Sequence, residues 1–492
     1  MIVRNGDGVL RPEETPLPGY APAEGSIPTL DVPDLSPLRR VHLVGIGGAG
    51  MSGIARLLLA RGLVVSGSDM KESRGLEDLR AAGATVFVGH RAAQLETPEP
   101  PDAVVVSSAV PQRNIELVEA RRRGIPVYAR AQVLAALMRG SRTVAVSGTH
   151  GKTTTTSMIS VILDRAGLDP TFVIGGHLNE VGSGARHGAG EWFVAESDES
   201  DGSFLLLHPE VAVVTNVGED HLDFYRDARE IRAAFARFFE QARHVVTCGD
   251  DPGVRAALRA AGREGDATTY GLHAGNDAVV TLQDPGALGA RGVLEVDGER
   301  IDLALRIRPQ HNLLNAAAAI LAAARAGVRP ADAAEALRSF QGVRRRFEFR
   351  GVGHGAEFFD DYAVHPTEVS AVLRAVSPEY RRVVAVLQPH RYTRMRAMWR
   401  ALGESLAPAD VVVVTDVYGA SEEPIPGISG KLVVEAIAEA EPRKRVVYLP
   451  RRSDVAPFLA GEVRPGDLVL TLGAGDITMV ADETLDRILG RA

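Results

Sequence analysis

The chain has 492 residues, of which 45% are hydrophobic and 24% charged, and it carries a formal net charge of −8 at pH 7. A chain of this length predicts about three domains, and the composition is that of a globular protein. The negative charge argues against nonspecific binding to nucleic acid. The single cysteine, Cys248, excludes an internal disulfide framework. No apolar run reaches the roughly 20 residues that a membrane helix needs.

The N-terminal segment, residues 1–38, contains seven prolines and shows no apolar periodicity. Such a composition cannot bury enough surface to offset the entropy lost on ordering, so we expect a flexible tail. The segment also lacks the apolar core of a signal peptide. We therefore expect a cytoplasmic protein that is not inserted in a membrane.

The first domain is expected over residues 39–138. A strand at 40–44 leads through a glycine turn into a helix at 53–61, and a second strand at 64–69 ends in Asp69. This is G-x-G-x-x-G between strand and helix, a pattern that places a diphosphate at a helix N-terminus. A UDP-sugar satisfies it as well as NAD does. The candidate substrate-binding residues of the turn are Gly47, Gly48, Ala49, Gly50, Met51 and Ser52.

Two further positions in this domain are candidates for the same ligand. Asp69 would accept hydrogen bonds from a ribose. Ser107 and Ser108 follow the apolar strand 102–106, at the edge where open α/β sheets place ligands. An ordinary turn between strand and helix is the alternative interpretation of the two serines.

The second domain, residues 139–342, opens on the most informative stretch, VAVSGTHGKTTTT. A strand, a glycine loop and Lys-Thr at the start of a helix predict a phosphate-binding loop, in which Lys152 reaches the β- and γ-phosphates and the Thr153 hydroxyl ligates Mg²⁺. Val146 stands where the usual loop has its first glycine, so this is a compact variant. The alternative is a glycine turn that only caps a helix. The candidate ATP-binding residues are Gly148, Thr149, His150, Gly151, Lys152, Thr153 and Thr154.

Polar residues also follow two other apolar strands of this domain. Glu196 ends the strand 192–195 and begins an acidic cluster, and His221 lies in a turn after the strand 211–215. Clustered carboxylates repel one another unless a cation compensates, and oxygen ligands suit Mg²⁺. A solvated acidic loop is the alternative. Farther along, His311 and Asn315 begin an alanine-rich helix, where they either contact a ligand or only cap the helix.

The third domain, residues 343–492, alternates strands and helices, which predicts another parallel sheet with its loops at one edge. Arg391 and Arg394 follow the strand 382–387. Their planar guanidinium groups at a strand end suit recognition of a carboxylate or a phosphate. Ordinary surface arginines are the alternative interpretation.

Taken together, these residues resemble the Mur ligases, the ATP-dependent enzymes that add amino acids during peptidoglycan synthesis. The resemblance covers residues 40–480 and rests on GIGGAGMSGIA, SGTHGKTTT, AESDESDGSF, TNVGEDHLD, HNLLNA, RRFE, DDYAVHPTEV, QPHRYTR, DVYGASEEPIPG and GAGDI. It implies an α/β fold of three domains, with a Rossmann-like N-terminal domain, a central P-loop ATPase-type domain and a Rossmann-like C-terminal domain. GIGGAGMSG, DDYxxHPTE and QPHRYTR are typical of members that join L-alanine, or a recycled peptide, to UDP-N-acetylmuramate.

The resemblance also implies roles for individual residues. The glycine turn at 47–52 would hold the UDP part of UDP-N-acetylmuramate, and Thr153, Glu196 and His221 would form the magnesium site. His311 and Asn315 look like adenine contacts, and Asp361 looks like a contact of the ATP ribose. Arg346 would approach the γ-phosphate, and His365, Arg391 and Arg394 would face the muramate carboxylate and the alanine. By the same resemblance, the residues expected to act on the substrates are Lys152, Arg346, His365, Arg391 and Arg394.

One position departs from the family pattern, because Val364 stands where the family usually has the first histidine of DDYxHHPTEV. The co-substrate is therefore less firmly indicated than the reaction. We expect ATP-dependent ligation of L-alanine to UDP-N-acetylmuramate by a monomer or weak homodimer. A ligase of recycled peptides is the alternative, and an NAD-dependent oxidoreductase or a noncatalytic UDP-sugar-binding regulator would leave the GTHGKTTT loop and the acidic cluster unexplained.

Overall fold

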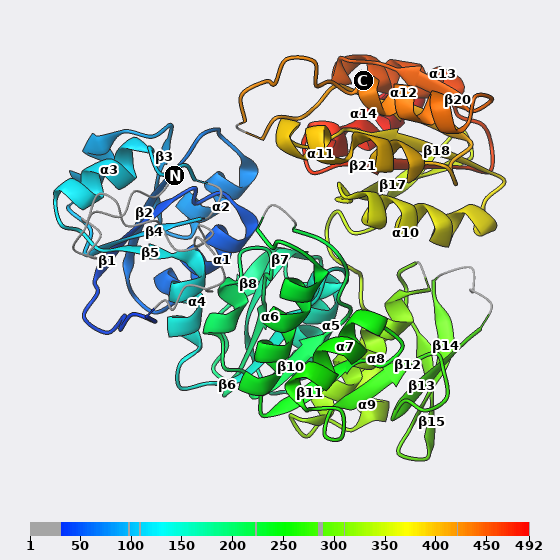
Figure 1. Cartoon of the computed structure of the whole chain (residues 1–492). Coiled ribbons are helices and arrows are strands. Elements are labelled where there is room, and N and C mark those ends of the chain that lie inside the picture. The colour runs from blue at the N-terminus through cyan, green and yellow to red at the C-terminus, as the bar shows by residue number, and fades with distance from the viewer. Residues whose placement is uncertain are drawn as a thin grey trace. The chain divides into compact units, whose positions relative to one another are not determined.

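The computed structural model describes residues 31–96, 99–107, 110–221, 224–283, 289–308, 310–420 and 422–491. Their helices and strands form three α/β domains, each built on its own sheet (Figure 1). The described residues separate into two compact units, one from Met1–Arg306 and Asn312–Gln341 and the other from Ile307–His311 and Gly342–Ala492. Within the described residues, no helix has both the length and the hydropathy needed to cross a membrane.

The first sheet is wholly parallel and has the strand order β3-β2-β1-β4-β5. Its strands are β1 (Arg40–Val44), β2 (Val64–Asp69), β3 (Thr85–Val88), β4 (Ala103–Val106) and β5 (Val127–Ala129). Its helices are α1 (Ala49–Ala60), α2 (Arg74–Ala81), α3 (Ile115–Arg122) and α4 (Arg130–Met138). The central strands β1 and β4 are almost entirely buried because helices cover both faces of the sheet. The order is that of a mononucleotide-binding sheet, as the glycine pattern predicts.

The central sheet is mixed, with the order β15-β14-β13-β12-β11-β10-β6-β9-β7-β8. Its strands are β6 (Arg142–Ser147), β7 (Thr171–Leu178), β8 (Ser183–Arg186), β9 (Trp192–Glu196), β10 (Val211–Val214), β11 (His244–Cys248), β12 (Thr268–Gly271), β13 (Ala278–Leu282), β14 (Arg291–Val296) and β15 (Glu299–Ala304). Its helices are α5 (Lys152–Arg165), α6 (Ala228–Gln241), α7 (Pro252–Ala261), α8 (Asn312–Ala324) and α9 (Pro330–Leu337). Strands β9, β6 and β10 are parallel neighbours, so their carboxyl ends lie side by side.

The third sheet has the order β16-β17-β21-β18-β19-β20. Its strands are β16 (Glu348–Gly353), β17 (Ala356–Asp361), β18 (Arg382–Leu387), β19 (Val411–Val414), β20 (Arg445–Tyr448) and β21 (Asp467–Leu472). Its helices are α10 (Pro366–Val376), α11 (Tyr392–Glu404), α12 (Lys431–Ala440), α13 (Val455–Glu462) and α14 (Met479–Ile488). All neighbours are parallel except the β16–β17 hairpin, because the two residues between these strands are too few for a parallel crossover.

In the part of the chain that the structure describes, short 3₁₀ helices lie at η1 (Ala92–Glu96), η2 (Ser203–Leu206), η3 (Ser377–Glu379), η4 (Arg452–Asp454) and η5 (Asp476–Thr478).

One hydrophobic cluster runs through both the first and the central sheet, which is why the two layers form a single unit. Leu43 and Met51 of the first layer belong to the same cluster as Phe193 and Val214 of the second. Helix α1 packs against β7 and β8. At Gly53 the two layers are so close that a Cβ atom would lie 3.2 Å from the Val173 side chain. This packing fixes the glycine turn of the first sheet relative to the second.

The predicted tail is only partly described, since its residues 1–30 lie outside the described residues. From Asp31 onward the chain contacts the first domain. The side chains of Val32 and Leu35 pack against the hydrophobic cluster, and Arg139 donates hydrogen bonds to the backbone oxygens of Val32 and Pro33. Residues 31–38 are therefore held on the domain surface by α4, and the boundary predicted at residue 38 stays a prediction.

A buried polar network stands behind the first glycine turn. The Glu116 carboxylate is fully buried and lies 3.3 Å from Nε2 of His42 and 2.9 Å from Nδ1 of His90, and it accepts a hydrogen bond from the Ser68 hydroxyl. Burial raises the pKa of Glu116, but the two imidazoles and the Ser68 hydroxyl outweigh it and lower the pKa to about 2. The Ser68 carbonyl accepts the N–H groups of Gly45 and Ile46, so the network supports the turn.

Replacing Glu116 by glutamine is expected to lower the free energy of unfolding by about 3 kcal/mol at pH 7, because the neighbouring imidazoles lose a buried negative partner. The folded-state pKa of Glu116 lies below that of the unfolded chain, so its stabilisation is complete above a pH of about 4.5 and is lost as the pH falls toward 2. Urea denaturation of both proteins between pH 7 and 3.5 measures the difference, which should shrink at the acidic end.

Glu119→Gln on the same helix is the matched control, because Glu119 pairs with Arg122 and Arg123 at the surface. Its effect should be much smaller than that of Glu116→Gln, because water screens surface ion pairs. A Glu116 variant as stable as the control at pH 7 would contradict the role assigned to the buried network.

Candidate functional site

The loop between β6 and α5 adopts a conformation that only glycine tolerates at two positions. Gly148 has φ +129° and Gly151 has φ +83°, both in the left-handed region. A Cβ atom at Gly148 would overlap Oγ1 of Thr215, and one at Gly151 would lie 2.7 Å from Oδ1 of Asn315. The loop is therefore shaped both by backbone conformation and by the neighbours that press against it.

Replacing Gly148 by alanine is expected to abolish detectable nucleotide binding, because the added methyl group collides with Thr215 and the φ of +129° is strained for any residue with a Cβ atom. Calorimetric titration with ATP measures the loss. Gly167→Ala is the control, since Gly167 also has a positive φ but has open space where its Cβ would lie. Equal ATP affinity in the Gly148 variant and the wild type would show that the loop is not used for nucleotide binding.

The residues that follow β10 hold this loop in place. The Asn216 side chain accepts a hydrogen bond from the His150 N–H and donates one to the His150 carbonyl. The Thr215 hydroxyl donates to the same carbonyl, and Oγ1 of Thr149 accepts a hydrogen bond from the Gly218 N–H. The two strand ends thus fix each other, which is a consequence of β6 and β10 being parallel neighbours.

Lys152, the first residue of α5, is buried and ion-paired. Its Nζ lies 2.8 Å from Oε1 of Glu199 and 2.6 Å from the Gly148 carbonyl oxygen, and the two side chains are only 15% and 3% exposed. Burial lowers the pKa of Lys152, but the charges of Glu199 and Asp198 outweigh it, and the pKa is raised. The side chain is therefore held as an ammonium group beside the loop.

Thr153 and Glu196 meet at the start of the same helix. The Thr153 hydroxyl lies 3.1 Å from Oε1 of Glu196, and Oε2 of Glu196 accepts a hydrogen bond from the Gly175 N–H. Among the described residues no three His, Cys, Asp or Glu side chains lie close enough together to hold a metal ion. Magnesium is commonly bound by one or two protein oxygens together with phosphates and water, so the Thr153 hydroxyl and the Glu196 carboxylate fit it.

His221 lies beside Glu199. Its Nε2 is 3.6 Å from Oε1 of Glu199 and 3.7 Å from Oδ2 of Asp220, and its φ is +55°. Burial lowers the pKa of the imidazole, but the carboxylates of Glu199 and Asp220 outweigh it and the pKa is raised. The assignment of Thr153, Glu196 and His221 to one metal site stays a prediction.

The predicted adenine contacts lie where the chain enters α8. Asn315 is buried, accepts a hydrogen bond from the Thr155 hydroxyl and donates one to Oδ1 of Asn312. It thereby joins α8 to the phosphate-loop helix next to Gly151. His311 immediately precedes this helix and is exposed. Capping and ligand contact both remain compatible with these positions.

The glycine turn of the first sheet offers its backbone to solvent. Gly48 and Ala49 are exposed, and Gly48 caps α1 without a side chain, whereas the Met51 side chain is buried in the core and the Ser52 hydroxyl donates to the Ala49 carbonyl. A ligand at this turn can therefore contact Met51 only through its backbone.

The other candidates of this domain are placed as follows. Each oxygen of Asp69 accepts a backbone N–H, one from Gly47 and one from Met70, so the carboxylate shapes the turn, and its contact with a ribose stays a prediction. Ser107 directly follows β4 and is half-buried. Ser108 lies outside the described residues.

Predicted residues of the third domain lie at the sheet edge where β17 ends and the antiparallel β16 begins. Asp361 ends β17, is buried and accepts hydrogen bonds from the N–H groups of Phe347 and Ala363, and burial raises its pKa to about 6. Arg346 lies over the Tyr362 ring, 5.5 Å from its centroid. His365 caps α10.

The two arginines after β18 flank a neutral histidine. Arg391 caps α11 with φ +65°, and Nη1 of Arg394 donates to Nδ1 of His390 at 3.2 Å. Burial, together with the charges of Arg394 and Arg391, lowers the pKa of His390 to about 4. The histidine adds no charge to that of the two arginines, whose guanidinium groups suit an anionic ligand.

The structure adds residues that the sequence reasoning did not select. Glu199 was one of four carboxylates in the acidic cluster, and its pairing with Lys152 distinguishes it from the rest. Arg345 donates to the carbonyls of Gly473, Ala474 and Gly475 and pairs with Asp360, so it organises the strand ends of the third sheet. No spacing in the sequence marks either contact.

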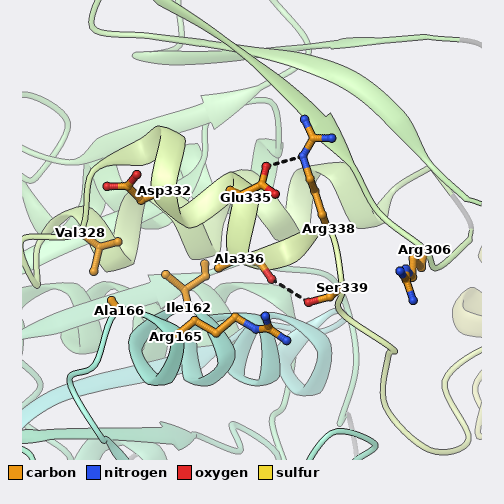
Figure 2. Close-up of a pocket in the computed structure, with 10 residues that line it drawn as sticks. All are labelled: Ile162, Arg165, Ala166, Arg306, Val328, Asp332, Glu335, Ala336, Arg338 and Ser339. Atoms are coloured by element: carbon orange, nitrogen blue, oxygen red, sulfur yellow. Dashed lines mark hydrogen bonds and ion pairs between the residues drawn. The ribbon is translucent and has the colours of Figure 1, made fainter.

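A cavity of about 490 Å³ lies on the far side of the phosphate-loop helix, between the end of α5 and α9 (Figure 2). Ile162 and Arg165 line it from α5, and Ala336 lines it from α9. Figure 2 shows Arg338 turned away toward Glu335, with which it forms an ion pair. None of the predicted site residues is among the described residues that line this cavity.

Comparisons with known proteins agree with this architecture. Three family models match the chain in order: the Mur ligase family catalytic domain at residues 40–142, the Mur ligase middle domain at 146–323 and the Mur ligase glutamate ligase domain at 345–475. The chain is thus an α/β protein of three domains, and it belongs to the Mur ligase family.

The chain is also similar to individual members of this family over most of its length. The chain is 49% identical over 471 residues to a UDP-N-acetylmuramate–L-alanine ligase of Mycobacterium sp. (strain JLS), a match that covers 92% of this chain and 96% of the relative. A relative of the same name from Rubrobacter xylanophilus is 46% identical, covering 91% and 100%. The crystal structure of UDP-N-acetylmuramate–alanine ligase from Thermotoga maritima matches with a TM-score of 0.79 and 28% identity, covering 92% and 100%. A murein peptide ligase from Psychrobacter arcticus matches with a TM-score of 0.70 and 25% identity, covering 92% and 99%.

Proposed function

We propose that the chain joins L-alanine to the carboxylate of UDP-N-acetylmuramate, with cleavage of ATP to ADP and phosphate, as a step of peptidoglycan synthesis. The observation that carries the proposal is the 49% identity, over 92% of this chain and 96% of the relative, to a protein named for this reaction. The phosphate loop with its buried Lys152 supports the use of ATP. We also infer a cytoplasmic enzyme, monomeric or weakly dimeric, that neither binds nucleic acid nor enters a membrane.

The chemistry requires activation of the carboxylate, because an amine does not displace oxide from a carboxylate at neutral pH. The γ-phosphoryl group of ATP passes to a carboxylate oxygen, giving an acyl phosphate and ADP. The alanine amine then attacks the acyl carbon, the C–O bond to phosphate breaks, and the amine loses a proton as the amide forms. The protein contributes positioning and positive charge.

We assign this positive charge to residues of the motifs found in the sequence. Lys152 holds a permanent ammonium group at the loop, where it neutralises transferring phosphoryl oxygens. We assign Arg346 to the same phosphoryl group, and His365, Arg391 and Arg394 to the muramate carboxylate and the alanine. Thr153, Glu196 and His221 would hold Mg²⁺, which, when bound, neutralises phosphate charge.

The test is release of phosphate from ATP in the presence of UDP-N-acetylmuramate and a panel of amino acids and short peptides. Release with L-alanine, and much less with glycine, L-serine or a tripeptide, supports the proposal. Preference for the tripeptide would favour a ligase of recycled peptides, which the similarity to the murein peptide ligase and the unusual Val364 make the second candidate. No release with any acceptor would overturn both.

A further inference from the structure

Arg130 is a cation placed at the glycine turn of the first sheet by a different part of the chain. It is the first residue of α4, directly after β5 ends at Ala129. The carboxyl ends of β1 and β5 lie on the same edge of the parallel sheet, so Arg130 and the turn that follows β1 emerge together. Helix α4 also packs against α1, the helix that the turn begins.

The Arg130 side chain lies flat against the third glycine of the motif. A Cβ atom at Gly50 would be 2.9 Å from Nη1 and 3.3 Å from Cδ of Arg130. The absence of a side chain at Gly50 therefore creates the space that the guanidinium occupies. In this chain, a residue with a side chain at the third glycine position would therefore collide with Arg130, in addition to any effect on the packing of the helix on the strand.

The hydrogen-bond donors of the Arg130 guanidinium are not used within the described part of the chain. Nη2 of Arg130 lies 3.7 Å from Oδ2 of Asp198, an attraction beyond hydrogen-bond distance, and Oδ1 of Asp198 accepts the Ser200 N–H instead. Within the described residues no hydrogen bond from Arg130 is made, and its side chain is 22% exposed. Its donors thus remain available to a ligand, while Asp198 keeps the group near the turn.

We propose that Arg130 binds the diphosphate of the UDP-linked substrate, together with the backbone N–H groups at the start of α1. The proposal rests on the proposed function, which places a UDP-sugar at this turn. A diphosphate presents paired oxygens to a planar guanidinium fork, an arrangement that gives strong and directional hydrogen bonds. Backbone N–H groups alone carry only partial charge, so Arg130 supplies the full positive charge of this subsite.

The position of Arg130 also links the two binding sites of this unit. Asp198 belongs to the acidic segment that follows β9, two residues from Glu196. Asp198 lies 3.7 Å from Arg130, and the next residue, Glu199, is paired with Lys152 at 2.8 Å. The acidic segment thus lies between a cation of the phosphate loop and the cation of the glycine turn.

The experiment measures calorimetric affinities of Arg130→Ala and Arg130→Lys for UDP-N-acetylmuramate, UDP, uridine and ATP. In Arg130→Ala the dissociation constants of both diphosphate ligands should rise about 10- to 100-fold, with those of uridine and ATP changing less than about twofold. Arg130→Lys should fall between the alanine variant and the wild type, because it keeps the charge but loses the fork. Arg122→Ala is the control, since Arg122 is an exposed arginine at the end of α3, paired with Glu119.

The outcomes separate this inference from the proposed function. Wild-type protein that binds neither UDP-N-acetylmuramate nor UDP would overturn the proposed function itself. Wild-type binding together with unchanged affinity in Arg130→Ala would overturn only the role of Arg130. Equal weakening of UDP and uridine would show that Arg130 merely shapes the turn, and would overturn the inference as well.

Discussion

Replacing Lys152 by alanine is expected to reduce the rate of ATP-dependent ligation by about a thousandfold. Lys152 begins the helix that follows the phosphate loop, and its ammonium group brings a full positive charge to the loop backbone, 2.6 Å from the Gly148 carbonyl oxygen. A positioned charge that neutralises a transferring phosphoryl group typically contributes this much to a rate. Phosphate release at saturating ATP and UDP-N-acetylmuramate measures it.

The same substitution has a structural cost that must be separated from the chemical one. Removing the ammonium group leaves the buried Glu199 carboxylate without its nearest cation, with His221 3.6 Å away, which is expected to lower the free energy of unfolding by about 3 kcal/mol. The double variant Lys152→Met/Glu199→Gln removes both charges, so its stability should return most of the way to that of the wild type. Its activity should remain as low as that of Lys152→Ala.

Urea denaturation and turnover of the single and double variants therefore form a decisive pair of measurements. A double variant that regains both stability and turnover would mean that Lys152 is only a structural partner of Glu199. Turnover close to that of the wild type in a folded Lys152→Ala protein would remove the residue from the reaction altogether.

Part of this site could be predicted from the sequence because parallel strands impose it. The strands that end in Ser147 and Glu196 and the strand that Thr215 follows are neighbours in one sheet, so their polar ends meet without any long-range information beyond the topology. The glycines of the loop likewise follow from local backbone geometry, since positions with positive φ require them. The antiparallel strand β16 departs from the parallel sheet expected in the third domain, because the two residues between β16 and β17 permit only a hairpin.

The choice of partners within the acidic cluster could not be predicted in the same way. Glu196 and Glu199 are three residues apart, and both follow one strand, yet Glu196 faces Thr153 whereas Glu199 faces Lys152. The path of the chain after β9 decides this, and the Tyr225 hydroxyl, which donates to the Glu199 carbonyl, helps to fix that path. Arg130 could not be selected from the sequence for a similar reason. It is 80 residues from Gly50 along the chain, and the two residues meet only because both lie at the same edge of the sheet.

The second large expected effect concerns Glu196, which we assign to the magnesium site. Replacing Glu196 by glutamine is expected to raise the Mg²⁺ concentration needed for half-maximal activity about 10- to 100-fold, because the amide keeps the shape of the side chain but not its charge. Titration of Mg²⁺ into the protein with a non-hydrolysable ATP analogue should show the same shift by calorimetry. Glu191→Gln is the matched control, since Glu191 is exposed at the opposite end of the same strand.

His221→Ala distinguishes a nitrogen ligand from a structural turn residue. As a ligand, His221 should show a smaller loss with Mn²⁺ than with Mg²⁺, because manganese accepts imidazole nitrogen more readily. As a partner of Glu199 only, 3.6 Å away, its removal should lower stability equally with either metal and leave the metal-activation curve in place. An unchanged curve in both Glu196→Gln and His221→Ala would remove the metal from this edge of the sheet, whereas a shift in Glu196→Gln alone would leave Glu196 and Thr153 as its protein oxygens.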